Sequence, residues 1–120
     1  MILFNVLFVT LVMFCSSAFA NDTPFKIRSA MSEDHFGGVL LDIIVTSLAD
    51  NIFVKNVEVN RGACKEGPSN YRMKNKSLKF GQSVTYQWRL FNGIDNSSYE
   101  CEVIEVKVYS SAGDFTYYPN

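Results

Sequence analysis

The chain has 120 residues, of which 48% are hydrophobic and 19% are charged, and its formal net charge at pH 7 is −1. This length is enough for one domain. The near-neutral charge gives no electrostatic reason to expect a nucleic acid or an anionic membrane as a partner. The positive charges of YRMKNKSLK, at residues 71–79, are interleaved with other residues. We interpret this stretch as a solvated loop face rather than a docking patch.

The first twenty residues, MILFNVLFVTLVMFCSSAFA, contain no charged side chain and are mostly apolar. They end in Ala18-Phe19-Ala20, the small-x-small pattern that signal peptidases recognise. The apolar run is shorter than the roughly 20 residues that a membrane-spanning helix needs. We therefore predict a cleaved signal peptide over residues 1–20 and a secreted or periplasmic domain over residues 21–120, with no membrane span after cleavage. An uncleaved anchor and a buried core helix are the alternatives.

Removal of the signal peptide leaves two cysteines, Cys64 and Cys101. An even pair in a small exported domain indicates a disulfide. Neither cysteine has a CxxC partner, and the only histidine, His35, is distant in sequence. Zinc binding and redox catalysis therefore lack their ligands. We predict a Cys64–Cys101 cross-link, which for a loop of this size contributes roughly 4 kcal/mol in the chain-entropy model.

The first half of the mature sequence predicts three β-strands. PFKIRSAM, at residues 24–31, is an early strand. GGVLLDIIVTSL, at residues 37–48, is rich in β-branched residues and almost continuously apolar, which suits a central strand. NIFVKNVEVN, at residues 51–60, alternates but changes phase between Val54 and Val57. A change of phase within a strand predicts a β-bulge.

The second half predicts further strands. LKF, at residues 78–80, is a short one, and SVTYQWRLF, at residues 83–91, has the clearest period of two, with valine, tyrosine, tryptophan and leucine on one face. SYECEVIEVKVYS, at residues 98–110, is also predicted as a strand, with a change of phase near Val103. AGD then makes a hairpin into FTYYP, at residues 115–119.

About seven short strands separated by turns predict an all-β fold, an antiparallel β-sandwich. The single tryptophan, Trp88, lies between the two cysteines but far from the first. In a true immunoglobulin domain the tryptophan follows the first cysteine closely and packs on the disulfide between the sheets. An immunoglobulin-like or fibronectin-III-like sandwich is therefore the better description.

Three stretches of this sequence resemble a family of small exported bacterial proteins with immunoglobulin-like or fibronectin-III-like folds, which includes the interleukin receptor mimics of pathogenic Escherichia. They are VNRGAC (59–64), LKFGQSVTY (78–86) and YECEVIEVKVYSSAGDFTY (99–117). The resemblance implies a fibronectin-III-like sandwich, a secreted or periplasmic location, strand-swapped dimers and binding to a partner protein. Its motifs are structural, so it assigns no functional residue.

One short segment groups residues that could hold a metal or move a proton. SEDHF places Glu33, Asp34 and His35 next to one another. Adjacent residues of an extended chain point to opposite sides, so this spacing does not bring three ligands together. We interpret the segment as a solvated loop and expect no metal, no cofactor and no catalytic residue.

Three glutamates, Glu100, Glu102 and Glu105, follow one predicted strand and could act as the acidic pair of a glycosidase. Such enzymes need a cleft, which a small sandwich rarely supplies. We favour a solvent-exposed strand face on which these glutamates pair with Lys107 or Arg89.

Aromatic residues supply the candidate binding residues, which are Phe91, Tyr117 and Tyr118. The two tyrosines are adjacent, so one of them faces away from the core if the chain is extended there. Phe91 lies on the polar phase of its strand. Exposed aromatic side chains are common anchors of protein interfaces. The alternative is a strand that is packed on both sides or a covered edge.

The C-terminal hairpin, Val106 to Tyr118, is predicted to form a sheet edge that pairs with another chain. FTYY has high β-propensity, and no charged side chain follows Asp114. Few of the charges that protect natural edges are present. Strand addition or swapping with a second copy would make a homodimer. A short edge shielded by a loop is the alternative.

These observations favour a non-enzymatic protein-binding module that acts on a host or bacterial protein. The resemblance favours binding to a host receptor in the manner of a cytokine receptor mimic. A periplasmic inhibitor or immunity protein is a second version of the same role. A small hydrolase that uses the strand carboxylates is the alternative of another class.

Overall fold

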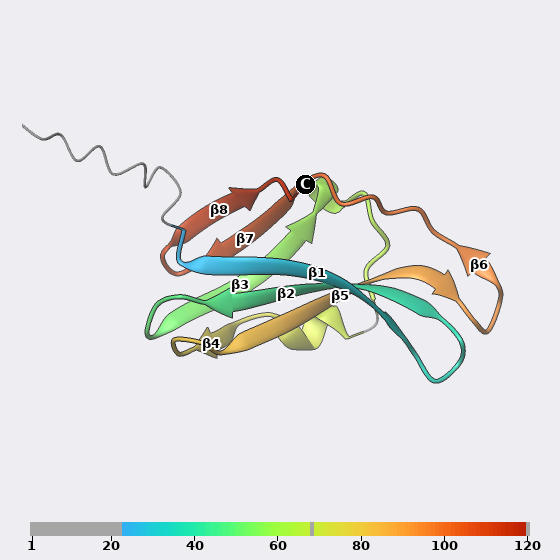
Figure 1. The fold of residues 1–120 in the computed structure, drawn as a ribbon, viewed down its shortest axis with the longest axis horizontal. Helices are drawn as coiled ribbons and strands as arrows, with labels where there is room; N and C mark the ends of the chain where they lie inside the picture. The colour runs from blue at the N-terminus through green and yellow to red at the C-terminus, as the bar shows by residue number, and fades with distance from the viewer. Residues whose placement is uncertain (1–22, 68, 120) are drawn as a thin grey trace, which may run out of the picture.

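The computed structural model describes residues 23–67 and 69–119 (Figure 1). The signal peptide predicted over residues 1–20 lies outside the described residues. Within them the protein is all-β, with eight strands and two short 3-10 helices, η1 (Asn60–Gly62) and η2 (Asn70–Met73). Each pair of neighbouring strands is antiparallel. The predicted all-β fold is therefore confirmed.

The strands form two four-stranded sheets that pack as a sandwich (Figure 1). Sheet A has the order β1 (Phe25–Glu33), β2 (Val39–Ser47), β5 (Ser83–Asn92) and β6 (Ser97–Ser98). Sheet B has the order β4 (Lys76–Leu78), β3 (Ile52–Val59), β7 (Val106–Ser110) and β8 (Gly113–Tyr117). The chain crosses between the sheets after β2, β4 and β6, as in immunoglobulin-like sandwiches. This arrangement leaves β1, β6, β4 and β8 as the sheet edges.

The core lies between the sheets and is made by alternate residues of the central strands. In β5 the buried residues are Val84, Tyr86 and Trp88, as the period of two predicts. Beside them in the same sheet lie the buried residues of β2, namely Leu41, Ile43 and Val45. Both sets face the buried residues of β3 and β7 in sheet B, namely Ile52, Val54, Val57, Val59, Val106 and Val108. The Tyr86 hydroxyl donates to the carbonyl of Met73 (2.5 Å), and burial raises the pKa of this tyrosine to about 12. The two central strands of each sheet thus contribute most of the packed apolar surface.

Two bulges set which side chains face the core. The one predicted in the third strand is confirmed, because the register of β3 against β7 shifts between Val54 and Asn56. A second shift lies where β2 meets the end of β5, because Leu40 pairs with Arg89 whereas Val39 pairs with Phe91. The additional residue moves Phe91 to the face that Val39 occupies. The alternating pattern of β5 predicts Phe91 on the polar face. The bulge places it on the opposite face.

The predicted strand over residues 98–110 is wrong in its first part. Residues 99–105 are irregular, and regular pairing begins at Val106. The reason is a set of contacts with η1 and the loop after it. Cys101 is bonded to Cys64, with Cα atoms 5.4 Å apart, which confirms the predicted disulfide. The side chain of Asn60 donates to the carbonyl of Glu102 (2.6 Å) and accepts from the N–H groups of Ile104 (2.8 Å) and Glu105 (3.0 Å). A side chain thus satisfies backbone groups that a neighbouring strand would otherwise bind.

We expect Asn60→Ala to lower the free energy of unfolding by about 1–2 kcal/mol more than Asn75→Ala, because the side-chain hydrogen bonds to Glu102, Ile104 and Glu105 are lost. Both asparagines have positive φ, 50° and 61°, so both substitutions incur the left-handed backbone penalty of alanine. Among the described residues the Asn75 side chain makes no hydrogen bond, which makes Asn75→Ala the matched control. Urea denaturation of the two variants measures the difference. Equal losses would show that the side-chain bonds of Asn60 contribute nothing.

Candidate functional site

The four sheet edges differ in how well they are protected against pairing with another chain. Natural edges are protected by shortness and by charged side chains, lysine above all. β6 has two residues, and the three-residue β4 contains Lys76. β1 carries the charged residues Lys26, Arg28 and Glu33. β8 has five residues, of which only Asp114 is charged. It is the least protected long edge in the described part of the chain.

The backbone of β8 presents hydrogen-bonding groups on its outer side. Two residues join β7 to β8, and Ser110 is paired with Gly113 at the turn. In a two-residue hairpin this closing pair is hydrogen-bonded, and hydrogen-bonded pairs then alternate with non-bonded ones. The N–H and C=O groups of Asp114 and Thr116 therefore point away from β7. No strand of the described residues pairs with this side of β8.

A groove of about 450 Å³ lies between β8 and β1, the edge strands of the two sheets. The residues that line it are Thr23, Phe25, Ile27, Thr116, Tyr117, Tyr118 and Pro119. Beside it the rings of Phe25 and Phe115 meet edge to face, with centroids 6.1 Å apart. The groove therefore combines an apolar wall with a backbone edge.

The two adjacent tyrosines differ in their exposure. Tyr117 is half-buried and packs against the core, whereas Tyr118 is 68% exposed. The hydroxyl of Tyr117 is buried and has no hydrogen-bond partner among the described residues. Burial raises the pKa of the Tyr117 phenol, and the neighbouring Thr23 acts against this shift. The Thr23 hydroxyl itself donates to the carbonyl of Phe25 (3.1 Å). Tyr117 thus retains an unused polar group in the wall of the groove.

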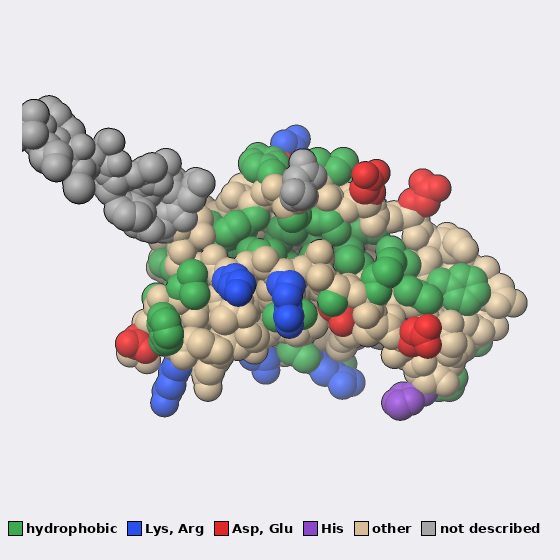
Figure 2. Space-filling model, viewed as in Figure 1, with side chains coloured by type: hydrophobic (Ala, Val, Ile, Leu, Met, Phe, Trp, Pro, Cys, Tyr) green, Lys and Arg blue, Asp and Glu red, His purple; other side chains and the backbone are tan. Residues whose placement is uncertain are grey.

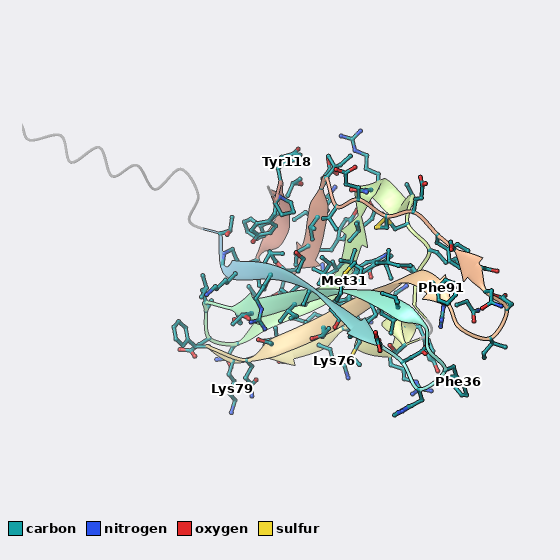
Figure 3. All side chains as sticks on the ribbon, turned by 45° about the vertical axis from the view of Figure 1, so that its right-hand side comes forward. Met31, Phe36, Lys76, Lys79, Phe91 and Tyr118 are labelled. Carbon is teal, nitrogen blue, oxygen red and sulfur yellow. A yellow bond between two sulfur atoms is a disulfide. The ribbon has the colours of Figure 1, made fainter. Side chains whose placement is uncertain are left out.

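The structure does not bring the three candidate binding residues together. Tyr117 and Tyr118 lie at β8, whereas Phe91 lies near the end of β5, at the other end of the sandwich (Figures 1 and 3). The sequence places all three residues on strand ends. It contains no signal that would have separated them into two regions.

The expected acidic strand face is absent, which is a correction. Glu100, Glu102 and Glu105 lie in or at the end of the irregular segment, not along one strand. Glu105 pairs with Arg61 (3.2 Å) rather than with the predicted Lys107 or Arg89. Arg89 instead pairs with Asp34, in the turn between β1 and β2 (3.4 Å). The regular spacing on which the hydrolase alternative depended is therefore lost.

The SEDHF segment spans the last two residues of β1, Ser32 and Glu33, and the start of the turn between β1 and β2. The Asp34 carboxylate accepts from the backbone N–H groups of Gly38 (2.7 Å) and Phe36 (2.9 Å), which lowers its pKa below the usual 3.8. The neighbouring His35 is exposed. Within residues 23–67 and 69–119, no three histidine, cysteine, aspartate or glutamate side chains group in a way that could hold a metal ion. Asp34 thus acts as the residue that closes this turn.

Comparison with known proteins adds no relative. The sequence matches no family model, and no curated protein or solved structure is significantly similar to it. The resemblance to small exported bacterial proteins therefore stays a prediction. In the described part of the chain, no helix is long and apolar enough to cross a membrane. Fold and geometry together define a disulfide-bonded β-sandwich whose candidate site is the β8 edge and its groove.

Proposed function

We propose that residues 21–120 form an exported, non-enzymatic protein-binding module that binds an extended segment of a partner protein along β8. The observation that carries this proposal is the poorly protected outer edge of β8 beside an apolar groove. Export is supported by the signal-peptide pattern of residues 1–20 and by the disulfide, because disulfides persist in oxidising compartments.

Binding by strand addition gives each part of the site a role. The incoming segment pairs with the outward N–H and C=O groups of Asp114 and Thr116, which supply main-chain affinity. Its alternate side chains point to opposite faces. Those on one face enter the groove and contact Phe25 and Tyr117.

A second copy of the chain is one source of such a segment. Two β8 strands related by a two-fold axis pair antiparallel, and each then satisfies the free groups of the other. A host receptor or a bacterial protein, as in the receptor-mimic and inhibitor versions of the function, would use the same edge. The receptor-mimic version is supported only by the sequence resemblance.

We expect the wild-type protein to dimerise at high micromolar concentration and Thr116→Pro to remain monomeric. Proline removes the outward N–H group at this position without removing a hydrogen bond to β7. Thr116→Ala, which keeps the N–H group, is the matched control and should dimerise like the wild type. Light scattering coupled to size exclusion measures the mass of each protein across a concentration series.

The heterologous version is tested with a displayed library of random linear peptides. Peptides selected on the wild type should bind Thr116→Ala with similar affinity and bind Thr116→Pro at least tenfold more weakly. They should carry apolar residues at alternate positions, because alternate side chains enter the groove. A wild-type protein that stays monomeric and yields no peptide sensitive to the proline would overturn the proposal.

A further inference from the structure

A second surface lies at the end of sheet A that is far from β8. It is formed by the β1–β2 turn (residues 34–38) and the β5–β6 turn (residues 93–96), which project together beyond sheet B (Figure 1). We call these two turns the hairpin tip. Their backbones are in direct contact, because a Cβ atom added to Gly93 would lie 1.8 Å from the carbonyl oxygen of Phe36. A Cβ atom on Gly38 would likewise lie 2.9 Å from the carbonyl oxygen of Phe91.

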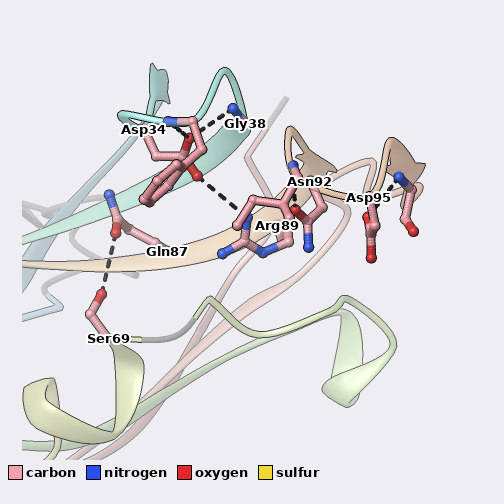
Figure 4. Close-up of polar contacts among 10 residues, drawn as sticks. Asp34, Gly38, Ser69, Gln87, Arg89, Asn92 and Asp95 are labelled. Carbon is pink, nitrogen blue, oxygen red and sulfur yellow. Dashed lines mark hydrogen bonds and ion pairs between the residues drawn. The ribbon is translucent and has the colours of Figure 1, made fainter.

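Side-chain hydrogen bonds hold both turns in place (Figure 4). In the first turn, Asp34 accepts two backbone hydrogen bonds and pairs with Arg89 of β5 (3.4 Å), so it also links the turn to the next strand. In the second turn, Asn92 accepts from the N–H group of Ile94 (3.0 Å) and Asp95 accepts from that of Ser97 (2.9 Å). The tip is therefore ordered before any partner binds, which reduces the entropy that binding would cost.

Large apolar side chains are exposed on this ordered support. Phe36 is 66% exposed and Ile94 is 73% exposed, each in one of the two touching turns. Phe91, near the end of β5, is partly exposed at the same end of the sandwich, as Figure 3 shows for Phe36 and Phe91. Binding residues are often carried by loops on a rigid scaffold, and buried aromatic anchors dominate many interfaces. Water-exposed Phe36 and Ile94 gain the free energy of burial only when a partner covers them.

The charge around the tip indicates the chemistry of the partner. Residues 31–38 and 89–97 contain three acidic side chains, Glu33, Asp34 and Asp95, and one basic side chain, Arg89. With His35 neutral, their formal net charge is −2. On the face in Figure 2, acidic side chains lie mainly over the right-hand half, where apolar side chains also gather. A negative rim repels anionic lipid and nucleic acid and attracts lysine and arginine.

We propose that the hairpin tip is a second protein-docking surface, whose partner presents an apolar surface rimmed by lysine or arginine. Phe36 and Ile94 are the apolar anchors, and Glu33 and Asp95 are the charges that orient the partner. Asp34 and Arg89 position the turn. This surface is independent of strand addition at β8, because the two lie at opposite ends of the sandwich (Figure 1).

Three synthetic helical peptides of equal length test the proposal, one built from leucine and lysine, one from leucine and glutamate, and one from serine and lysine. The leucine–lysine peptide should bind at least tenfold more tightly than the other two, with an affinity that falls as salt is added. Amide shifts of isotope-labelled protein should move at residues 34–38 and 93–97. Phe36→Ser combined with Ile94→Ser should weaken this binding at least tenfold.

Two further variants distinguish binding at Phe36 and Ile94 from non-specific binding to exposed apolar side chains, and measure the contribution of charge. Tyr71 and Phe80 are each 65% exposed but lie among the basic residues near η2 and β4, so Tyr71→Ser combined with Phe80→Ser should leave the affinity unchanged. Glu33→Gln combined with Asp95→Asn should weaken binding several-fold and reduce its salt dependence. Asparagine keeps the oxygen that accepts from Ser97, so the turn is retained.

Several results would overturn the proposal. Equal binding of the leucine–lysine and serine–lysine peptides would make the tip an electrostatic contact only. If Phe36→Ser combined with Ile94→Ser left the affinity for the leucine–lysine peptide unchanged, the peptide would bind outside the hairpin tip. Tighter binding to vesicles of anionic lipid than to the peptide would make the partner a membrane. The protein could also self-associate in a way that Phe36→Ser combined with Ile94→Ser abolishes and Thr116→Pro does not. This result would make the partner a second copy joined through the tip.

Discussion

Replacing both Cys64 and Cys101 by alanine should lower the free energy of unfolding by about 4 kcal/mol. The two cysteines are 37 positions apart, and cross-linking a loop of this size removes conformational entropy from the unfolded chain. Domains of this kind have about 5–15 kcal/mol of stability in total. The variant should therefore be partly unfolded at 37 °C if the total lies at the lower end of this range. Urea denaturation followed by circular dichroism measures the loss.

The same measurement under reducing conditions supplies the control. A reductant should destabilise the wild-type protein by a similar amount and leave the double variant unchanged. Intact-mass measurement on protein from its native compartment should show no free thiol before reduction. A double variant within about 1 kcal/mol of the wild type would show that the hydrogen bonds of Asn60 are enough to hold residues 99–105 against η1.

Trp88→Ala should cost about 3–5 kcal/mol, because it removes a large side chain from a well-packed site. Trp88 is 1% exposed and lies between the sheets beside the ring of Tyr86, with centroids 6.5 Å apart. Its backbone also forms a bridge to Glu66 of the loop that follows the disulfide. We expect the cavity to destabilise the whole sandwich, since this residue contacts both the central strands and that loop.

Leu90→Ala, two residues further along β5, is the matched control. Leu90 has the same phase as Trp88 but is only partly buried, so its loss should be about 1–2 kcal/mol. Circular dichroism is the required probe, because the protein contains one tryptophan and the Trp88→Ala variant has no tryptophan fluorescence left. Equal losses at the two positions would contradict the placement of the core between the central strands.

If both proposed surfaces are correct, the protein binds at two ends of one sandwich. Thr116→Pro acts only on the backbone of β8, and the Phe36 and Ile94 variant acts only on exposed side chains of the hairpin tip. Neither change touches a fully buried residue. The two variants can therefore be combined, and the combined variant should show at each surface the same loss of affinity as the corresponding separate variant, because distant sites without shared partners act independently.

Local sequence patterns were sufficient to predict most strands. The alternation in residues 83–91 gives a strand with Val84, Tyr86 and Trp88 buried, and the apolar run at residues 37–48 is a central strand. The phase change after Val54 is a bulge. These features follow from the two-residue period of a strand, which each short segment expresses without reference to the rest of the chain.

The disulfide and the C-terminal hairpin could also be predicted from the sequence. The predicted removal of residues 1–20 leaves two cysteines, which allow only one pairing, so the prediction of Cys64–Cys101 required no knowledge of the fold. The turn after Ser110 carries its own signal in glycine and aspartate, and β7 and β8 do form a hairpin.

Only the tertiary structure decided where the exposed surfaces lie. Residues 99–105 have the alternation of a strand, but Asn60 and Cys64, distant in sequence, bind this segment and leave its glutamates unaligned. Phe91 changes face because β5 contains an additional residue opposite β2. The turns that carry Phe36 and Ile94 are adjacent because their strands belong to one sheet. Each of these features depends on which segments pair across long distances and in what register, and a local period of two does not encode either.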